Sequence, residues 1–214
     1  MSIQEMRKTY TMSGLSKSDV DHDPMVQFQR WFEEANQPDL PDWMEINAMT
    51  LATADAQGRV TSRIVLLKGI EDGRLCFYTN YESEKGQQMA ENPEVALCFL
   101  WGHLQRQVRI EGKVTKSERG KSIDYFHSRP RESQLGALVS QQSSVIESGR
   151  TLQEQFTALE SKYKQQEIPC PNHWGGYEVQ PTRLEFWQGR AGRLHDRICY
   201  RVDGEQWQLS RLAP

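Results

Sequence analysis

The chain has 214 residues, which suits one domain of ordinary size or at most two small ones. Its 26 Lys and Arg residues stand against 29 Asp and Glu residues, so the net charge is −3 and the cation surplus of a dedicated nucleic-acid binder is missing. No run approaches the roughly 18 apolar residues of a membrane helix, and the first residues lack the apolar core of a secretory signal. We therefore expect a cytoplasmic protein with no nucleic-acid partner and no membrane partner.

Cysteine spacing and apolar content add two expectations. The four cysteines, Cys76, Cys98, Cys170 and Cys199, form no C-x-x-C pair, and we expect free thiols rather than disulfides or a metal site. Apolar residues make up only 37% of the chain, a low share for this length. The composition therefore predicts that subunits share part of the core.

The N-terminal part is expected to precede a single domain. Residues 1–20 are polar and lack a sustained period, which predicts a mobile arm before one domain over residues 21–214. Asp23 and Pro24 are a helix N-cap and a first-turn proline, and apolar residues then recur at helical spacing up to Asn36. From residue 46 the period shortens toward two, which predicts strands at 46–54, 59–69, 74–80, 94–102 and 105–116.

Helices are expected between and after these strands. Ser83 and Ser117 each precede a short helical stretch that they can cap, and Thr151 and Glu154 form a capping box before a longer helix that ends before Pro169. The chain then returns to predicted strands at 177–179, 184–187, 198–202 and 206–209. Many short antiparallel strands with a few helices favour an α+β fold, a β-barrel with helices packed outside it.

Basic residues recur beside hydroxyl groups at the ends of these elements. Arg63 and Lys68 bracket the apolar run of one predicted strand. Lys85 falls in the first turn of the helix after Ser83, where free backbone N–H groups favour an anion. Taken alone, the first feature is more typical of solvated charges at strand ends, and the second of an ordinary helix cap.

Two later segments concentrate similar chemistry. Residues 125–134 hold two arginines and several hydroxyl groups around a proline, which suits a phosphate dianion, although a solvated loop has the same composition. Residues 141–144 are amides and hydroxyls, which suit hydrogen bonds to the edge of a heterocycle but are also typical of a polar surface loop. Residues 186–197 place several cations beside Trp187 and His195, where an anion or a π-system would relieve their repulsion. With no metal-binding motif and no nucleophile–base pair, this inventory predicts a phosphorylated aromatic cofactor beside a phosphorylated substrate.

Long blocks of the chain resemble the pyridoxine/pyridoxamine 5′-phosphate oxidase family, in order from about Arg7 to the last residue. The blocks are RIVLLK (63–68), FYTN (77–80), RQV (106–108), YFHSRPRESQLGALVSQQSS (125–144), PNHWGGY (171–177), EFWQGRAGRLHDR (185–197) and RLAP (211–214). The resemblance implies an FMN-binding split β-barrel with peripheral helices, and a homodimer with FMN at the subunit interface. It also implies oxidation of pyridoxamine 5′-phosphate or pyridoxine 5′-phosphate to pyridoxal 5′-phosphate, with dioxygen accepting the electrons as hydrogen peroxide.

The resemblance also assigns residues by position. It implies FMN contacts at Arg63, Ile64, Val65, Leu66, Leu67, Lys68, Tyr78, Thr79, Lys85, Gln107, Gln142, Ser143, Trp187 and Arg197. It implies substrate contacts at Arg7, Tyr10, Lys68, Tyr125, Arg129, Ser133, Arg193, Leu194 and His195, with the N-terminal arm as a lid. Arg193 and His195 are the candidate catalytic residues, which hold the ring and assist proton removal while a hydride passes to the flavin N5.

The chain departs from the family pattern at two places, and other functions stay open. Glu84 precedes Lys85 where the family usually has two basic residues, which predicts weaker FMN binding. Ser16 and Lys17 stand where relatives are often richer in arginine, which argues against an accessory product site there. The alternatives are another split-barrel flavin enzyme, such as a flavin reductase using a nicotinamide cofactor, and a non-catalytic carrier of FMN or pyridoxal phosphate.

Overall fold

The structure is a computed structural model that describes residues 2–6 and 9–214. Within these residues one antiparallel sheet has the strand order β2-β1-β5-β6-β7-β4-β3, with β8 paired to β7 and β9 paired to β8. β2 also approaches β4, so the strand path curls toward closure as in a split barrel. The strands are β1 (Ala48–Ala54), β2 (Val60–Leu66), β3 (Gly69–Glu71), β4 (Arg74–Asn80), β5 (Glu94–Trp101), β6 (Arg106–Lys116), β7 (Trp174–Gln188), β8 (Asp196–Asp203) and β9 (Gln206–Leu212).

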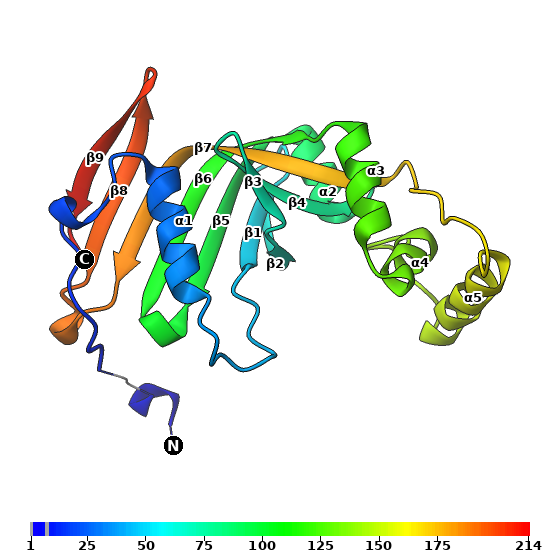
Figure 1. Cartoon of the computed structure of the whole chain (residues 1–214), viewed down its shortest axis with the longest axis horizontal. Coiled ribbons are helices and arrows are strands. Elements are labelled where there is room, and N and C mark those ends of the chain that lie inside the picture. Colours follow the sequence, from blue (N-terminus) through cyan, green and yellow to red (C-terminus); the bar gives the residue numbers. More distant parts are fainter. Residues whose placement is uncertain (1, 7–8) are drawn as a thin grey trace.

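The helices lie outside the sheet, and the predicted α+β class with a split barrel and peripheral helices is confirmed. α1 lies across one side of the barrel, whereas α3, α4 and α5 gather at the far end of β7 (Figure 1). In the described part of the chain no helix has the length and apolar character needed to cross a membrane. The helices are α1 (Pro24–Ala35), α2 (Glu84–Glu91), α3 (Arg119–Ser128), α4 (Arg131–Val139) and α5 (Gly149–Lys162).

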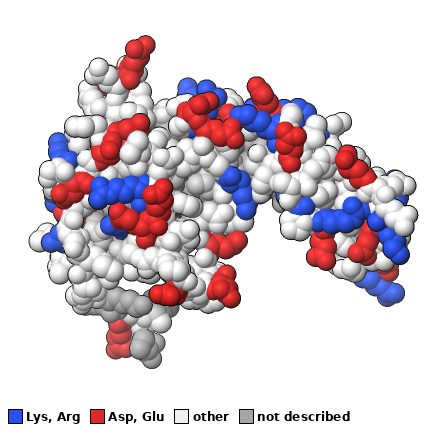
Figure 2. All heavy atoms as spheres, viewed as in Figure 1, with Lys and Arg blue, Asp and Glu red and all other residues white. Residues whose placement is uncertain are grey.

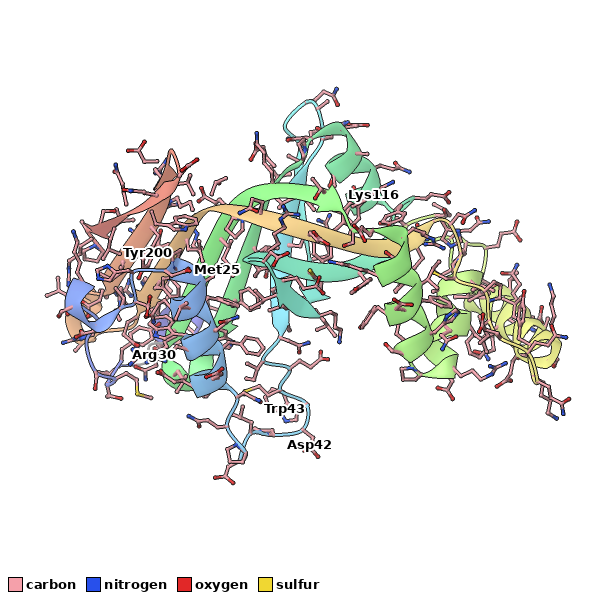
Figure 3. The ribbon with its side chains drawn as sticks, turned by 45° about the horizontal axis from the view of Figure 1, so that its top comes forward. Met25, Arg30, Asp42, Trp43, Lys116 and Tyr200 are labelled. Atoms are coloured by element: carbon pink, nitrogen blue, oxygen red, sulfur yellow. The ribbon has the colours of Figure 1, made fainter. Side chains whose placement is uncertain are left out.

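Aromatic packing joins α1 to the barrel. Asp23 caps the helix by accepting a hydrogen bond from the backbone N–H of Met25 at 2.7 Å, as the sequence predicts. Phe28 is fully buried with its ring 5.1 Å from that of Phe99. The buried Tyr200 of β8 donates its hydroxyl hydrogen to the carbonyl of Asp21, which ties the segment before α1 to the sheet. Figure 3 labels Tyr200 on β8 and Met25 at the start of α1. Truncating a buried phenylalanine of this kind typically costs about 3–5 kcal/mol.

The C-terminal strands differ from the prediction, because one continuous strand, β7, replaces two short ones. Pro181 lies inside β7, where a proline is expected to interrupt a strand. It lies opposite a register shift between Glu111 and Gly112 of β6, and this bulge accommodates the proline. A Cβ atom on Gly112 would lie 2.2 Å from the carbonyl oxygen of Gln180, so only glycine allows this approach. β7 therefore continues unbroken for 15 residues, from the start of the strand beside α3 to its pairing with β8 (Figure 1).

Two predicted helix caps are wrong. The N-cap of α3 is Glu118 rather than Ser117, and its side chain makes no capping bond. α5 begins at Gly149, capped by Ser148, so Thr151 and Glu154 lie inside the helix and form no capping box. In both cases the cap lies within three residues of the predicted one, where several hydroxyl and acidic side chains compete for the same role.

Helix α4 was not predicted. The sequence indicates that a helix ends before Pro130, and α3 does end at Ser128. Pro130 is also the N-cap residue of α4, with the acidic Glu132 in the first turn, so the proline separates two consecutive helices. Leu135 of α4 is buried with Phe126 and Trp174 in a second, smaller core.

Candidate active site

A cavity of about 610 Å³ opens between β2 and the junction of α3 with α4. Figure 2 shows the molecule hollowed between the barrel and the helical end, and Figure 1 places β2 and α4 on the two sides of this hollow. Twelve of the predicted site residues line the cavity, together with Pro130 and Trp174: Arg63, Ile64, Val65, Leu66, Lys68, Tyr78, Thr79, Lys85, Tyr125, Arg129, Ser133 and Gln142.

The first part of this cavity is built around two cations, Arg63 of β2 and Lys85 of α2. Burial first, and then the charge of Arg63, lowers the pKa of Lys85 to about 8. The Lys85 ammonium donates to the uncharged amide oxygen Oε1 of Gln142 at 2.9 Å, so this bond leaves its positive charge unneutralised. A buried lysine beside an arginine repels it electrostatically, so this part of the cavity fits an anion.

The start of α2 explains how Lys85 reaches the cavity. Ser83 accepts from the backbone N–H of Gly86 at 3.3 Å and donates to the carbonyl of Asn80 at 2.6 Å, which caps the helix beside the end of β4. A Cβ atom on Gly86 would lie 2.2 Å from the carbonyl oxygen of Tyr81, so this close approach requires glycine. Ser143 is adjacent, because its hydroxyl accepts from the backbone N–H of Glu84 at 3.2 Å.

The second part of the cavity combines aromatic rings with Arg129. Tyr78 and Tyr125 are stacked with their ring centroids 3.9 Å apart. The Arg129 guanidinium lies 4.7 Å from the ring of Trp174. Burial lowers the pKa of Arg129, and its Nη1 atom is buried with no hydrogen-bond partner among the residues that the structure describes. An unpaired, desolvated guanidinium nitrogen beside Ser133 fits a second anionic group, such as a phosphate.

Five other predicted residues form a second group, on β6, β7 and β8 and in segments that pack against them. Gln107 pairs with Trp187, and Trp187 pairs with Arg197, so these three side chains form a row across three neighbouring strands. The ring of Tyr10, in the N-terminal arm, lies 5.6 Å from Trp187 and 5.3 Å from His195. His195 Nδ1 accepts from the backbone N–H of Arg190 at 3.1 Å, so the neutral ring carries its proton on Nε2.

Three more predicted site residues belong to neither group, and a fourth lies outside the described residues. Leu67 is 6% exposed and packs in the barrel core rather than in the cavity lining. Arg193 follows Gly192 with a left-handed φ of 61°, and Leu194 beside it is 72% exposed. Arg7 lies outside the described residues.

One chain brings these residues together in two groups rather than one. Trp174 lines the cavity at the start of β7, whereas Trp187 lies 13 positions later on the same strand. At about 3.3 Å per residue this separation is roughly 40 Å along the strand, which exceeds the reach of one mononucleotide. Figure 1 shows β7 running from the helical end to β8.

Trp174 lines the cavity although it is not among the predicted site residues. The structure places its ring in stacking contact with Tyr78, 5.5 Å between centroids, and under Arg129. Trp174 belongs to the block 171–177, which carries part of the family resemblance. That block holds no Lys, Arg, Asp or Glu, so its composition does not indicate a binding role.

The fold and the cavity define a split-barrel protein with a binding site for anionic, aromatic ligands. Family models carry this assignment further: residues 38–163 match pyridoxamine 5′-phosphate oxidase, and residues 174–214 match the pyridoxine 5′-phosphate oxidase C-terminal dimerisation region. The chain therefore belongs to the pyridoxamine 5′-phosphate oxidase family, which confirms the predicted family, its oxidoreductase class and its FMN cofactor.

Relatives match over the whole chain. A pyridoxine/pyridoxamine 5′-phosphate oxidase of Rhodopirellula baltica is 54% identical over an alignment of 217 positions that covers 100% of this chain and 97% of the relative. One of Cyanothece sp. is 49% identical, over 100% of this chain and 99% of the relative. Among solved structures, PhzG from Burkholderia lata 383, in complex with tetrahydrophenazine-1-carboxylic acid, has a TM-score of 0.88 at 26% identity and covers 95% of this chain and 99% of its own.

Proposed function

We propose that this protein is an FMN-dependent oxidase that converts pyridoxamine 5′-phosphate and pyridoxine 5′-phosphate to pyridoxal 5′-phosphate. Two electrons and two protons leave the substrate and reduce dioxygen to hydrogen peroxide, and water releases ammonia from the oxidised amine. The observation that carries the proposal is the pair of separate cationic groups in one cavity, Arg63 with Lys85 and the unpaired Arg129. Two phosphate-bearing ligands side by side account for both groups.

The FMN phosphate is assigned to the Arg63 and Lys85 group. Lys85 lies in the first turn of α2, where the free backbone N–H groups add to its charge. Bound FMN supplies the acceptor for the substrate hydride. Glu84 lies in the same turn and is exposed, so its charge opposes a phosphate that the two cations attract.

The substrate phosphate is assigned to Arg129, Tyr125 and Ser133. The Arg129 guanidinium lies over the Trp174 ring, 4.7 Å from its centroid, and this contact restricts the side chain before a ligand arrives. Both hydroxyl groups line the same cavity and can donate to phosphate oxygens. Lys68 also lines this cavity and is exposed, which allows it to contact either ligand.

The second residue group is proposed to complete the site from the partner subunit of a homodimer. The dimerisation region, residues 174–214, contains Trp187, His195 and Arg197, and their distance from the cavity along β7 argues against a site within one chain. A twofold axis makes each subunit give its cavity to one site and its Trp187 row to the other. FMN then lies at the subunit interface.

Arg193 and His195 are proposed to close over the substrate ring. His195 presents Nε2–H as a donor, because Nδ1 accepts from the backbone of Arg190. In this arrangement His195 holds a substrate oxygen, and it accepts a proton only after the Nδ1 bond opens and the ring changes tautomer. The Tyr10 ring packs against the His195 imidazole and shields it from water, which agrees with a lid role for the N-terminal arm.

Oxygen consumption with a panel of substrates tests the proposal. Pyridoxamine 5′-phosphate and pyridoxine 5′-phosphate should each yield hydrogen peroxide and pyridoxal 5′-phosphate in equal amounts, whereas a reduced nicotinamide cofactor should give no turnover. Turnover with the nicotinamide alone would favour a flavin reductase. FMN binding without turnover of any substrate would favour a carrier.

A second candidate is oxidation of a phosphate-free polycyclic ring. It is favoured by the similarity to PhzG, whose structure holds tetrahydrophenazine-1-carboxylic acid. Arg129 would then bind a carboxylate rather than a phosphate. Comparing tetrahydrophenazine-1-carboxylic acid with pyridoxamine 5′-phosphate as substrates separates the two candidates.

A further inference from the structure

A hydrogen-bonded cluster behind the cavity connects helix α2 to Arg63. Arg63 donates to the hydroxyl groups of Thr53, at 2.6 Å from Nη1, and of Thr61, at 2.5 Å from Nη2. Its Nη1 also donates to the carbonyl of Leu51 at 3.2 Å. Both threonine hydroxyls in turn donate to Gln88 Oε1, at 2.5 Å and 2.8 Å.

The direction of these bonds follows from the number of protons available. A guanidinium only donates, so each threonine oxygen must accept from Arg63 and direct its own proton elsewhere. The Gln88 carbonyl oxygen has two lone pairs and accepts both protons. Gln88 therefore holds both hydroxyl groups with their lone pairs toward Arg63.

The cluster lies behind the cavity wall rather than in it. Gln88 is 7% exposed and Thr53 is 2% exposed, and of the four side chains only Arg63 lines the cavity. Gln88 follows Lys85 by one helical turn on the same buried side of α2. One short helix therefore places Lys85 directly and fixes Arg63 through two threonines.

We propose that Gln88 is a positioning residue for the phosphate end of the cofactor site, acting through Thr53 and Thr61 on Arg63. The inference rests on the proposed function, because it takes FMN as the ligand of this end. Three of the five guanidinium N–H donors are committed to Thr53, Thr61 and Leu51, so the side chain is held in place and two donors remain for a ligand of the cavity that Arg63 lines. Without Gln88 the threonine hydroxyls rotate freely and Arg63 must be ordered when FMN binds.

The test compares FMN with riboflavin, which lacks the phosphate, on apoprotein variants. Ordering a long side chain costs about 0.5–1.5 kcal/mol, so Gln88→Met should weaken FMN binding roughly 2- to 12-fold and leave riboflavin binding unchanged. Quenching of flavin fluorescence measures both affinities. Gln87→Met is the matched control, since Gln87 is the exposed neighbour on α2 and bonds only to the carbonyl of Glu82 among the described residues.

A double-mutant cycle separates positioning from a general effect on folding. In an Arg63→Met background, Gln88→Met should cause no further loss of FMN affinity, because the group it positions is gone. Equal losses in both backgrounds, or an equal loss for riboflavin, would overturn the proposal. If Gln88→Met does not fold by circular dichroism, Thr61→Val at the half-buried end of the cluster takes its place in the same cycle. Wild-type apoprotein that binds no FMN would instead reject the proposed function itself.

Discussion

Replacing Arg129 with methionine removes the charge proposed to bind the substrate phosphate while keeping a side chain of similar length. Hydrogen bonds to charged groups contribute about 1.5–3 kcal/mol, so kcat/KM for pyridoxamine 5′-phosphate should fall roughly 10- to 150-fold. The loss should appear mainly in KM, because Arg129 binds a part of the substrate that does not react. FMN affinity should stay unchanged, since Arg63 and Lys85 are proposed to hold that phosphate.

Arg129→Met should lower activity, but it should not lower the stability of the ligand-free protein. Relieving a buried guanidinium nitrogen without a partner gains about 1–3 kcal/mol, and losing the contact of Arg129 with Trp174, at 4.7 Å, costs about 0.5–2 kcal/mol. The ligand-free variant should therefore be as stable as the wild type or slightly more stable. Thermal unfolding of the ligand-free protein measures this difference.

Steady-state kinetics with pyridoxamine 5′-phosphate and with unphosphorylated pyridoxamine tests the reasoning. Arg129→Met should lower the preference for the phosphorylated substrate, whereas Arg131→Met should leave it unchanged. Arg131 is exposed and donates to the carbonyls of Tyr163 and Gln166, outside the cavity. An equal loss on both substrates, or a large drop in stability, would refute a phosphate-binding role for Arg129.

Three further predictions concern the cofactor end and the dimer. Because the pKa of Lys85 is lowered to about 8, its charge is lost as the pH rises through that value, and FMN titrations should give a higher Kd at about pH 9 than at about pH 7; a flat profile would remove Lys85 from the phosphate site. Glu84→Arg should tighten FMN binding roughly 2- to 5-fold, as measured by flavin fluorescence, and weaker binding would contradict the unfavourable role of the carboxylate. At a substrate concentration well below KM, where Arg129→Met and His195→Ala are each strongly impaired, mixing the two kinds of subunit should restore about a quarter of wild-type activity, because half the dimers are hybrids with one intact site, and no recovery would argue against a shared site.

Local sequence patterns predict most of the barrel, and they fail where a distant residue decides the structure. The strand at 74–80 has the predicted bounds, and α1 has the predicted cap and first-turn proline. Pro181 suggests a strand break, but the bulge opposite it at Glu111 and Gly112 lets β7 continue. That bulge is 70 residues away in the sequence, so no local pattern reports it.

In the candidate site too, local sequence patterns predict one part and contacts between distant residues decide the rest. The identities of its residues can be predicted, because blocks such as 125–144 carry their chemistry in consecutive positions. The row of Gln107, Trp187 and Arg197 depends on the register of three strands, which only the pairing of β6, β7 and β8 determines. The unpaired nitrogen of Arg129 depends on burial, which the composition of its segment does not encode.

The visible spectrum of the purified protein, before and after anaerobic addition of pyridoxamine 5′-phosphate, tests the central claim most directly. An oxidase of the proposed kind should show a flavin band that bleaches with the substrate and returns when air is admitted, with pyridoxal 5′-phosphate formed in the first step. A flavin band that this substrate leaves unchanged would contradict the proposed reaction, and a colourless protein that added FMN cannot reconstitute would contradict the cofactor site itself.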